Sequence, residues 1–172
     1  MRVLLFAAAL SCCLLLAPSR SNAQSDLDQL DKKFIHYFEK VMPGWRHERG
    51  EPFGKSENVL IQFWYSSDTS VKISVVMHHS GNEARDALEQ FARTDPKRQT
   101  LKNIGDEAYA VGFAQSNIVL RKGKCVIYVS ARADAPAELK LIQEQRLEFE
   151  KKEMQRWSKE FAKHAADAAD GP

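Results

Sequence analysis

Two adjacent carboxylates, Asp106 and Glu107, form the first candidate for a catalytic or cation-binding site. Paired carboxylates can perform general acid–base catalysis or bind a cation. The pair enters a predicted strand, however, and neighbouring side chains on a strand point to opposite faces. A turn in which Gly105 bends the chain and Asp106 accepts hydrogen bonds from nearby backbone N–H groups accounts for the same residues. The sequence favours this turn, with a carboxylate-dependent hydrolase as the alternative.

Cys125 is a second candidate, because a thiol that is paired with a histidine can act as a nucleophile. Strand alternation places it on the same face as Ile127 and Val129. Apolar surroundings raise the pKa of a thiol and make it unreactive. The sequence therefore favours a buried cysteine, with a thiol-dependent hydrolase as the alternative.

The five histidines follow no metal-binding pattern. His78 and His79 are adjacent at the end of a predicted strand, so their rings point to opposite sides and cannot share one ion. The other histidines are far apart and lack the spacing of zinc ligands. The chain also lacks the Cys-x-x-Cys-His motif of covalently bound haem. We therefore expect no metal, no cofactor and no catalytic residue.

Arg121, Lys122 and Lys124 surround Gly123 at a predicted hairpin turn, and Arg132 lies a few residues beyond. Such a cluster could contact phosphate or an anionic lipid surface, but basic residues at a turn are also typical of a solvated sheet edge. The sequence favours the solvated edge. The formal net charge of the chain is +2, which is too small to indicate a nucleic-acid partner.

The N-terminus has the pattern of a secretory signal peptide. Arg2 is followed by an apolar run over residues 3–17, and the small residues Ser21 and Ala23 indicate cleavage after Ala23. The run is shorter than the ~20 apolar residues that a membrane-spanning helix needs. We therefore expect residues 1–23 to be removed, the protein to be periplasmic or secreted, and no transmembrane segment to remain.

The periodicity of the apolar residues predicts the order helix, two strands, helix, three strands, helix. In chain order these elements cover residues 25–41, 59–65, 71–78, 83–93, 108–113, 117–121, 125–131 and a long helix that begins at Asp134 and Pro136. Ser25 and Ser80 are in position to cap the first two helices. Residues 45–58 are compatible with a loop or a short edge strand.

Strands that are joined by short turns pair antiparallel, and a helix between two strand groups must lie across the sheet. The sequence therefore predicts a single α+β domain over residues 24–164, with an antiparallel sheet of about five strands packed against helices. Its last element is the long C-terminal helix. Residues 165–172 are small and polar, and we expect them to form a flexible tail.

The segment Ile104-Gly-Asp-Glu-Ala-Tyr109, followed by Ile118-Val-Leu-Arg-Lys-Gly123, resembles a pattern in small, uncharacterised exported bacterial proteins. In those proteins a Gly-Asp-Glu-Ala-aromatic turn leads into a hairpin with an Arg-Lys-Gly tip. Some of them look like the PsbP/Mog1-type α/β sandwich. The resemblance covers roughly residues 45–135 and implies the fold and the exported location, without catalytic residues.

Five aromatic residues are candidates for a ligand or partner surface: Trp45, Trp64, Tyr65, Trp157 and Phe161. The first three could line a cleft, and the last two lie in a helix that is long enough to project from a small domain. The sequence favours an exported, non-enzymatic module that binds a protein or a small molecule. One alternative is the small thiol- or carboxylate-dependent hydrolase. The other is a structural protein that forms a homodimer through its C-terminal helix.

Overall fold

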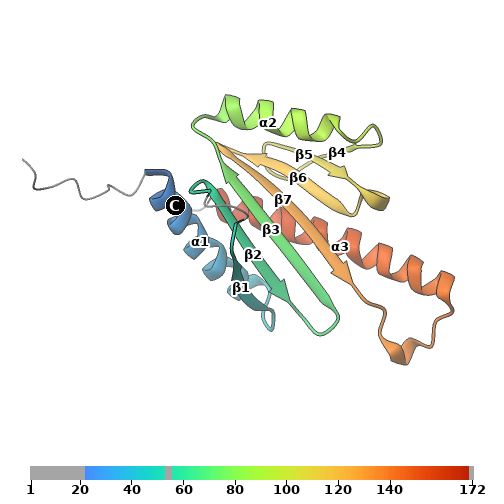
Figure 1. Ribbon diagram of the computed structural model, residues 1–172. Helices are drawn as coiled ribbons and strands as arrows, with labels where there is room; N and C mark the ends of the chain where they lie inside the picture. Colours follow the sequence, from blue (N-terminus) through green and yellow to red (C-terminus); the bar gives the residue numbers. More distant parts are fainter. Residues whose placement is uncertain (1–21, 53–55, 171–172) are drawn as a thin grey trace, which may run out of the picture.

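A computed structural model describes residues 22–52 and 56–170 and shows three α-helices with one antiparallel sheet of seven strands (Figure 1). The strand order is β1-β2-β3-β7-β6-β5-β4. The elements are α1 (Asn22–Val41), β1 (Arg46–Gly50), β2 (Val59–Tyr65), β3 (Thr69–Met77), α2 (Gly81–Arg93), β4 (Gln99–Leu101), β5 (Glu107–Val111), η1 (Phe113–Gln115), β6 (Asn117–Lys122), β7 (Cys125–Ala133), η2 (Ala137–Leu139) and α3 (Gln143–Asp170). The predicted α+β class and long C-terminal helix are confirmed, but the sheet has seven strands and not about five.

The two additional strands are the edges of the sheet. β1 pairs with β2, so the undecided region over residues 45–58 contains a short edge strand. β4 has three residues and pairs with β5. Short or charged edges discourage pairing with other chains. They also lack the apolar alternation that identifies a strand, which is why the sequence did not predict them.

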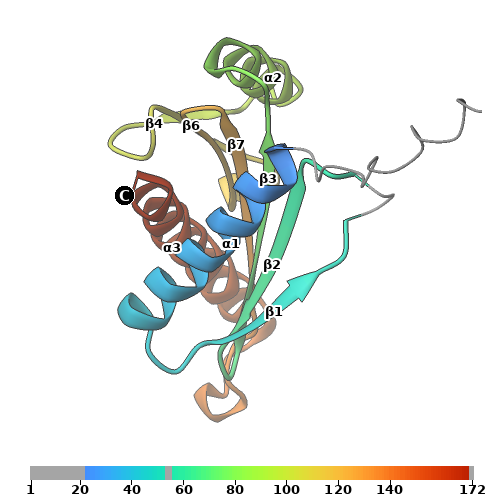
Figure 2. The same ribbon diagram turned by 90° about the vertical axis from the view of Figure 1, so that its left-hand side faces the viewer.

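Helices cover both faces of the sheet (Figure 2). α1 and α3 pack together on one face, and α2 lies on the other face over β6 and β7. Strand alternation turns Trp64, Ile73 and Leu120 toward α1 and α3, where all three are fully buried. On the opposite face, Leu88 of α2 packs against Val119 of β6. The larger core therefore lies between the sheet and the α1–α3 pair.

An aromatic cluster joins α1, α3 and the sheet. The ring centroid of Phe38 in α1 lies 5.0 Å from that of Phe161 in α3 and 5.0 Å from that of Trp64 in β2. Trp45 lies 4.8 Å from Phe161 and 5.0 Å from Trp157. Trp64 and Phe161 are fully buried, and Trp45 and Trp157 are partly buried against them. Of the five aromatics that were expected on a partner surface, Trp64 and Phe161 therefore belong to the core, whereas Trp45 and Trp157 pack against it and keep part of their surface exposed.

Of the two serines that were predicted to cap the first two helices, one does so. α1 begins at Asn22, so Ser25 lies inside the helix and is not its cap. Ser80 caps α2 as predicted, because its hydroxyl accepts a hydrogen bond from the backbone N–H of Glu83 at 3.2 Å.

The bounds of α3 differ from the prediction at both ends. The helix begins at Gln143 and not near Asp134, because the short 3₁₀ helix η2 comes first and Lys140 then adopts a φ of +47°. At the other end α3 continues to Asp170, so residues 165–170 are helical and not a flexible tail. Alanine has a high helix propensity, and three alanines of this end are buried.

Two predictions concern residues that the structure leaves out in whole or in part. The signal peptide prediction falls on residues 1–23, of which 1–21 lie outside the described residues. The last two residues of the predicted tail, 171–172, lie outside them as well. Within the described ranges, no helix has the length and apolar character that crossing a membrane requires.

Phe161→Ala is expected to lower the free energy of unfolding by about 3–5 kcal/mol, because it removes a ring from the close-packed aromatic cluster. Phe113→Ala is the matched control: this ring is 79% exposed, and its loss should change stability by less than about 0.5 kcal/mol. Urea denaturation followed by tryptophan fluorescence measures both. Equal losses in the two variants would contradict the assignment of Phe161 to the core.

Candidate functional site

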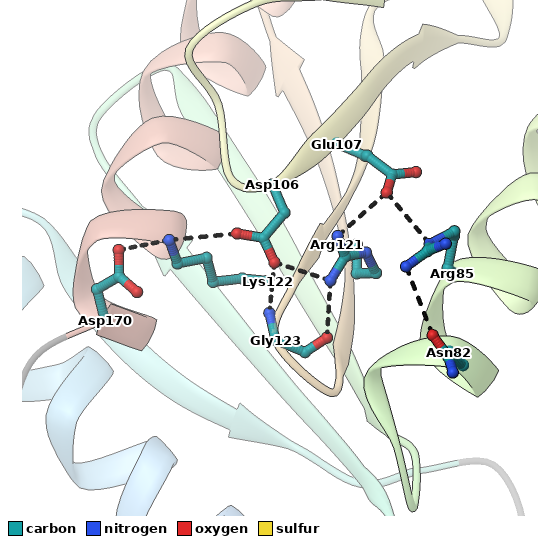
Figure 3. Close-up of polar contacts among 8 residues, drawn as sticks. All are labelled: Asn82, Arg85, Asp106, Glu107, Arg121, Lys122, Gly123 and Asp170. Atoms are coloured by element: carbon teal, nitrogen blue, oxygen red, sulfur yellow. Dashed lines mark hydrogen bonds and ion pairs between the residues drawn. The ribbon is translucent and has the colours of Figure 1, made fainter.

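The residues of the predicted turn motif meet at the tip of the β6–β7 hairpin (Figure 3). The Arg121 guanidinium donates from Nη1 to Asp106 Oδ2 at 2.8 Å and from Nη2 to Glu107 Oε1 at 3.1 Å. The backbone N–H of Gly123 donates to the same Asp106 oxygen at 2.9 Å. One arginine therefore neutralises both carboxylates, and Asp106 also holds the hairpin turn.

The two carboxylates converge on Arg121, so the expectation that the sheet separates them is wrong. Glu107 is the cross-strand partner of Arg121, whereas Asp106 precedes β5. The backbone N–H of Asp106 donates to the carbonyl oxygen of Arg121 at 2.9 Å. Gly105 makes this close approach possible: its φ is +59°, and a Cβ atom would lie 2.6 Å from the same carbonyl oxygen.

The same cluster connects the hairpin tip to two helices. We call it the hairpin clamp, and its members are Arg85, Asp106, Glu107, Arg121, Lys122, Gly123 and Asp170. Lys122 Nζ lies 2.5 Å from Asp170 at the end of α3 and 3.5 Å from Asp106. On the other side, Glu107 lies 3.6 Å from Arg85 of α2. β6 and β7 are interior strands, so these basic residues do not form the solvated sheet edge that the sequence favoured.

The hairpin clamp holds its members in their charged forms. Burial raises the pKa of Asp106, but the hydrogen bond from Gly123 and the charges of Arg121 and Lys122 outweigh burial and lower the pKa below its usual range. The hydrogen bond to Asp170 raises the pKa of Lys122. A general acid or base needs a pKa near the working pH, and both of these shifts lead away from neutrality.

Cys125 lies at the start of β7 and is buried, with 7% of its surface exposed. Burial raises the pKa of the thiol and outweighs the opposite effect of Lys124. A nucleophilic cysteine requires the reverse, a stabilised thiolate. Among the residues that the structure describes, no group of three or more His, Cys, Asp or Glu side chains is placed to hold a metal ion.

Tyr65 lies on the opposite face of β2 from the fully buried Trp64, so these two side chains do not line one cleft. Trp45 and Tyr65 do line one open pocket of about 520 Å³, together with residues 66–67 of the turn that follows β2. The ring of Tyr65 stacks on Phe63 with 6.3 Å between centroids. Both side chains are only partly exposed.

An open apolar groove lies between η1 and the first half of α3. Phe113 of η1 lines it together with Leu147, Phe149 and Met154 of α3, and its volume is about 830 Å³. Charged and polar side chains of residues 144–152 line it as well. Phe113 is 79% exposed and Leu147 is 59% exposed. We call this surface the α3 groove. Large apolar side chains with such exposure in one patch are typical of an interaction site.

The α3 groove exists because α3 is longer than the sheet beneath it. Its 28 residues span about 42 Å, whereas the nine-residue strands β3 and β7 span about 30 Å. The buried residues of α3 begin at Ser158, and Figure 1 shows the first half of the helix reaching past the end of β7. We call residues 143–156 the overhang.

One face of α3 carries apolar residues in both halves of the helix. Leu147, Met154, Ser158 and Phe161 recur at helical spacing, so they share one face. In the second half of α3 this face is buried against the sheet, with the Ser158 hydroxyl accepting a hydrogen bond from the Ala131 N–H at 3.0 Å. In the overhang the same face is more exposed, and its residues Leu147 and Met154 line the α3 groove.

Phe113 is presented by a strained turn with several anchors. Ala114 and Gln115 have φ values of +52° and +57°, a left-handed conformation that costs a non-glycine residue on the order of 1–3 kcal/mol. The N–H of Gly112 donates to Asp95 at 2.7 Å. The side chain of Gln155 in α3 donates to the carbonyl of Ala114. The structure therefore maintains backbone strain at the point where an aromatic ring is exposed.

The sequence did not predict the α3 groove. Phe113 ends the strand that the sequence predicts over residues 108–113, and the contact residues that the sequence suggests in the C-terminal helix are Trp157 and Phe161. The available signal for the first was Gly112, whose φ of +78° ends the strand one residue before the phenylalanine. For the helix, the available signal was its length, because a helix of 28 residues is longer than a strand of nine residues.

Comparison of the chain with protein-family models, with curated proteins and with solved structures found no match.

Asp106→Asn is expected to lower the free energy of unfolding by about 1–2 kcal/mol at pH 7 and by less at pH 3. Because the pKa of Asp106 is lowered in the folded state, its carboxylate contributes fully above the unfolded-state value of about 4. That contribution disappears as the pH falls through the folded-state pKa. Urea unfolding at the two pH values measures the difference.

Asp86→Asn is the control for this experiment, because Asp86 is exposed on α2 and lies outside the hairpin clamp. It should change stability little at either pH. A loss in Asp106→Asn that is as large at pH 3 as at pH 7 would show that the charge of Asp106 is not what stabilises the hairpin tip.

Proposed function

We propose that this protein is an exported, non-enzymatic interaction module that docks a protein partner in the α3 groove. The observation that carries the proposal is where the exposed apolar residues lie. The structure describes five exposed large hydrophobic side chains. Four of them, Phe113, Leu139, Ile142 and Leu147, lie on η1 or on the segment that leads from η2 into the overhang.

The shape of the groove favours a protein partner over a small molecule. Small-molecule sites are concave and enclose most of the ligand surface. The α3 groove instead runs open along an exposed helix, with Leu147 and Met154 two helical turns apart. A partner helix laid along such a surface buries apolar side chains at several turns at once.

The chemistry elsewhere in the chain supports binding over hydrolysis. The carboxylates of Asp106 and Glu107 are both engaged by Arg121, and the thiol of Cys125 is buried with a raised pKa. The proposed export depends on the signal pattern of residues 1–23.

Photo-crosslinking tests the docking function. We replace Phe113 with p-benzoylphenylalanine and illuminate cells that export the protein. A discrete covalent adduct is expected, because a partner in the α3 groove must lie against this ring. The adduct should disappear when Leu147→Glu is added, since a charge in the groove opposes apolar docking. Leu147 is exposed, so this change should leave the far-ultraviolet circular dichroism unchanged.

The same photoreactive residue at Gln90, exposed on α2, is the matched control and should give no such adduct. An adduct with a second copy of the chain counts as docking in the same way as an adduct with another protein. The proposal fails if position 113 gives no adduct, or if its adducts also form at position 90 or persist with Leu147→Glu.

A further inference from the structure

The overhang has a charge pattern that changes sign along its length. Residues 143–150 contain three acidic residues and one basic residue, whereas residues 151–157 contain three basic residues and one acidic residue. The boundary lies midway between Leu147 and Met154, the two apolar residues of the exposed stripe. Lys151 occupies that stripe between them, four residues after Leu147.

This pattern is complementary to itself when two overhangs lie antiparallel. A two-fold axis at the boundary places Leu147 of each copy against Met154 of the other. It also places the acidic residues 143–150 of each copy against the basic residues 151–157 of the other. A parallel arrangement would place like charges together, so the pattern selects the antiparallel one.

The antiparallel arrangement also suits the shape of the molecule. The sheet packs on the second half of α3, from Ser158 onward. Two helices that overlap only in their overhangs therefore carry their sheets at opposite ends of the pair. Each copy then presents Phe113 toward the middle of the interface, because Phe113 lines the same groove as Leu147 and Met154.

The ion pairs within the overhang leave these charges available to a partner. Glu148 lies 3.7 Å from Lys151 and 3.7 Å from Lys152 on the same helix, and Glu148 and Lys152 are mostly exposed. Exposed pairs at such distances contribute little to stability. Replacing these ion pairs by ion pairs across an interface therefore costs little stability. In the antiparallel pair, Lys151 lies near acidic residues of the other copy.

From these observations we infer that the occupant of the α3 groove is a second copy of this chain, which forms an antiparallel, two-fold symmetric dimer through residues 143–156. The inference depends on the proposed docking function and names its partner. It differs from the homodimer that the sequence suggested, because Phe161 is buried in the core and the contacts move to Phe113, Leu147 and Met154.

Charge reversal tests the inference with the mature chain, residues 24–172. An acidic variant carries Lys151→Glu and Lys152→Glu, and a basic variant carries Glu144→Lys and Glu148→Lys. Sedimentation velocity over about 1 μM to 1 mM should show a monomer–dimer equilibrium for the unsubstituted chain. Each variant alone should dimerise at least about tenfold more weakly, because like charges then face each other. An equimolar mixture of the two variants should recover the dimer.

The control carries Glu89→Lys and Arg93→Glu, which reverses an exposed ion pair of α2 and should leave the dissociation constant unchanged. A monomer at every concentration overturns the inference, as does a dimer that neither variant weakens or a mixture that fails to recover it. If the chain is monomeric but position 113 still crosslinks another protein in a Leu147-dependent manner, the inference fails and the docking function stands. If no Leu147-dependent adduct of any kind forms, both fail.

Discussion

The position of α3 depends on the packing of Phe161 against Phe38, Trp45 and Trp64. This contact joins the C-terminal helix to α1 and to β2, and it lies in the second half of α3. The hairpin clamp adds a second attachment at the end of the helix, where Lys122 meets Asp170. Both attachments act on the C-terminal half. The first half of α3 has fewer buried residues and is bonded to η1 and to Ala135 through Gln155 and Glu150, so it extends from the body that these attachments fix.

The two halves of α3 differ in their surroundings. The second half is packed in the core, and the overhang is largely exposed. Phe161 is fully buried in the core, whereas Leu147 is 59% exposed and lines the α3 groove with Phe113. The strained turn of η1 borders this uncovered half and is bonded to it through Gln155. The exposed ring of Phe113 and the overhang therefore form one surface, although they are more than thirty residues apart in the sequence.

Local patterns predicted the elements of this fold better than they predicted its surface. The strands β2, β3, β6 and β7 could be found because their apolar residues alternate, and α2 because Ser80 caps it. β1 could not be found, because an edge strand with the sequence Arg-His-Glu-Arg-Gly has no apolar face.

The two candidate sites show a related limit. The types of Asp106, Glu107 and Arg121 are the same in a catalytic centre and in a structural clamp. Only the strand register, which pairs Glu107 with Arg121, distinguishes the two. The exposure of Leu147 depends on where the sheet ends beneath α3, and no local pattern within α3 contains that information.

The burial of Cys125 has a consequence for how long any assembly of this protein lasts. It is the free cysteine of the described chain, and its sulfur is shielded by the core and by a raised pKa. In an oxidising compartment, an accessible thiol would link neighbouring copies covalently and make their association permanent. With the thiol buried, an association of the kind proposed above would be non-covalent and reversible, and its occupancy would follow the local concentration of the protein.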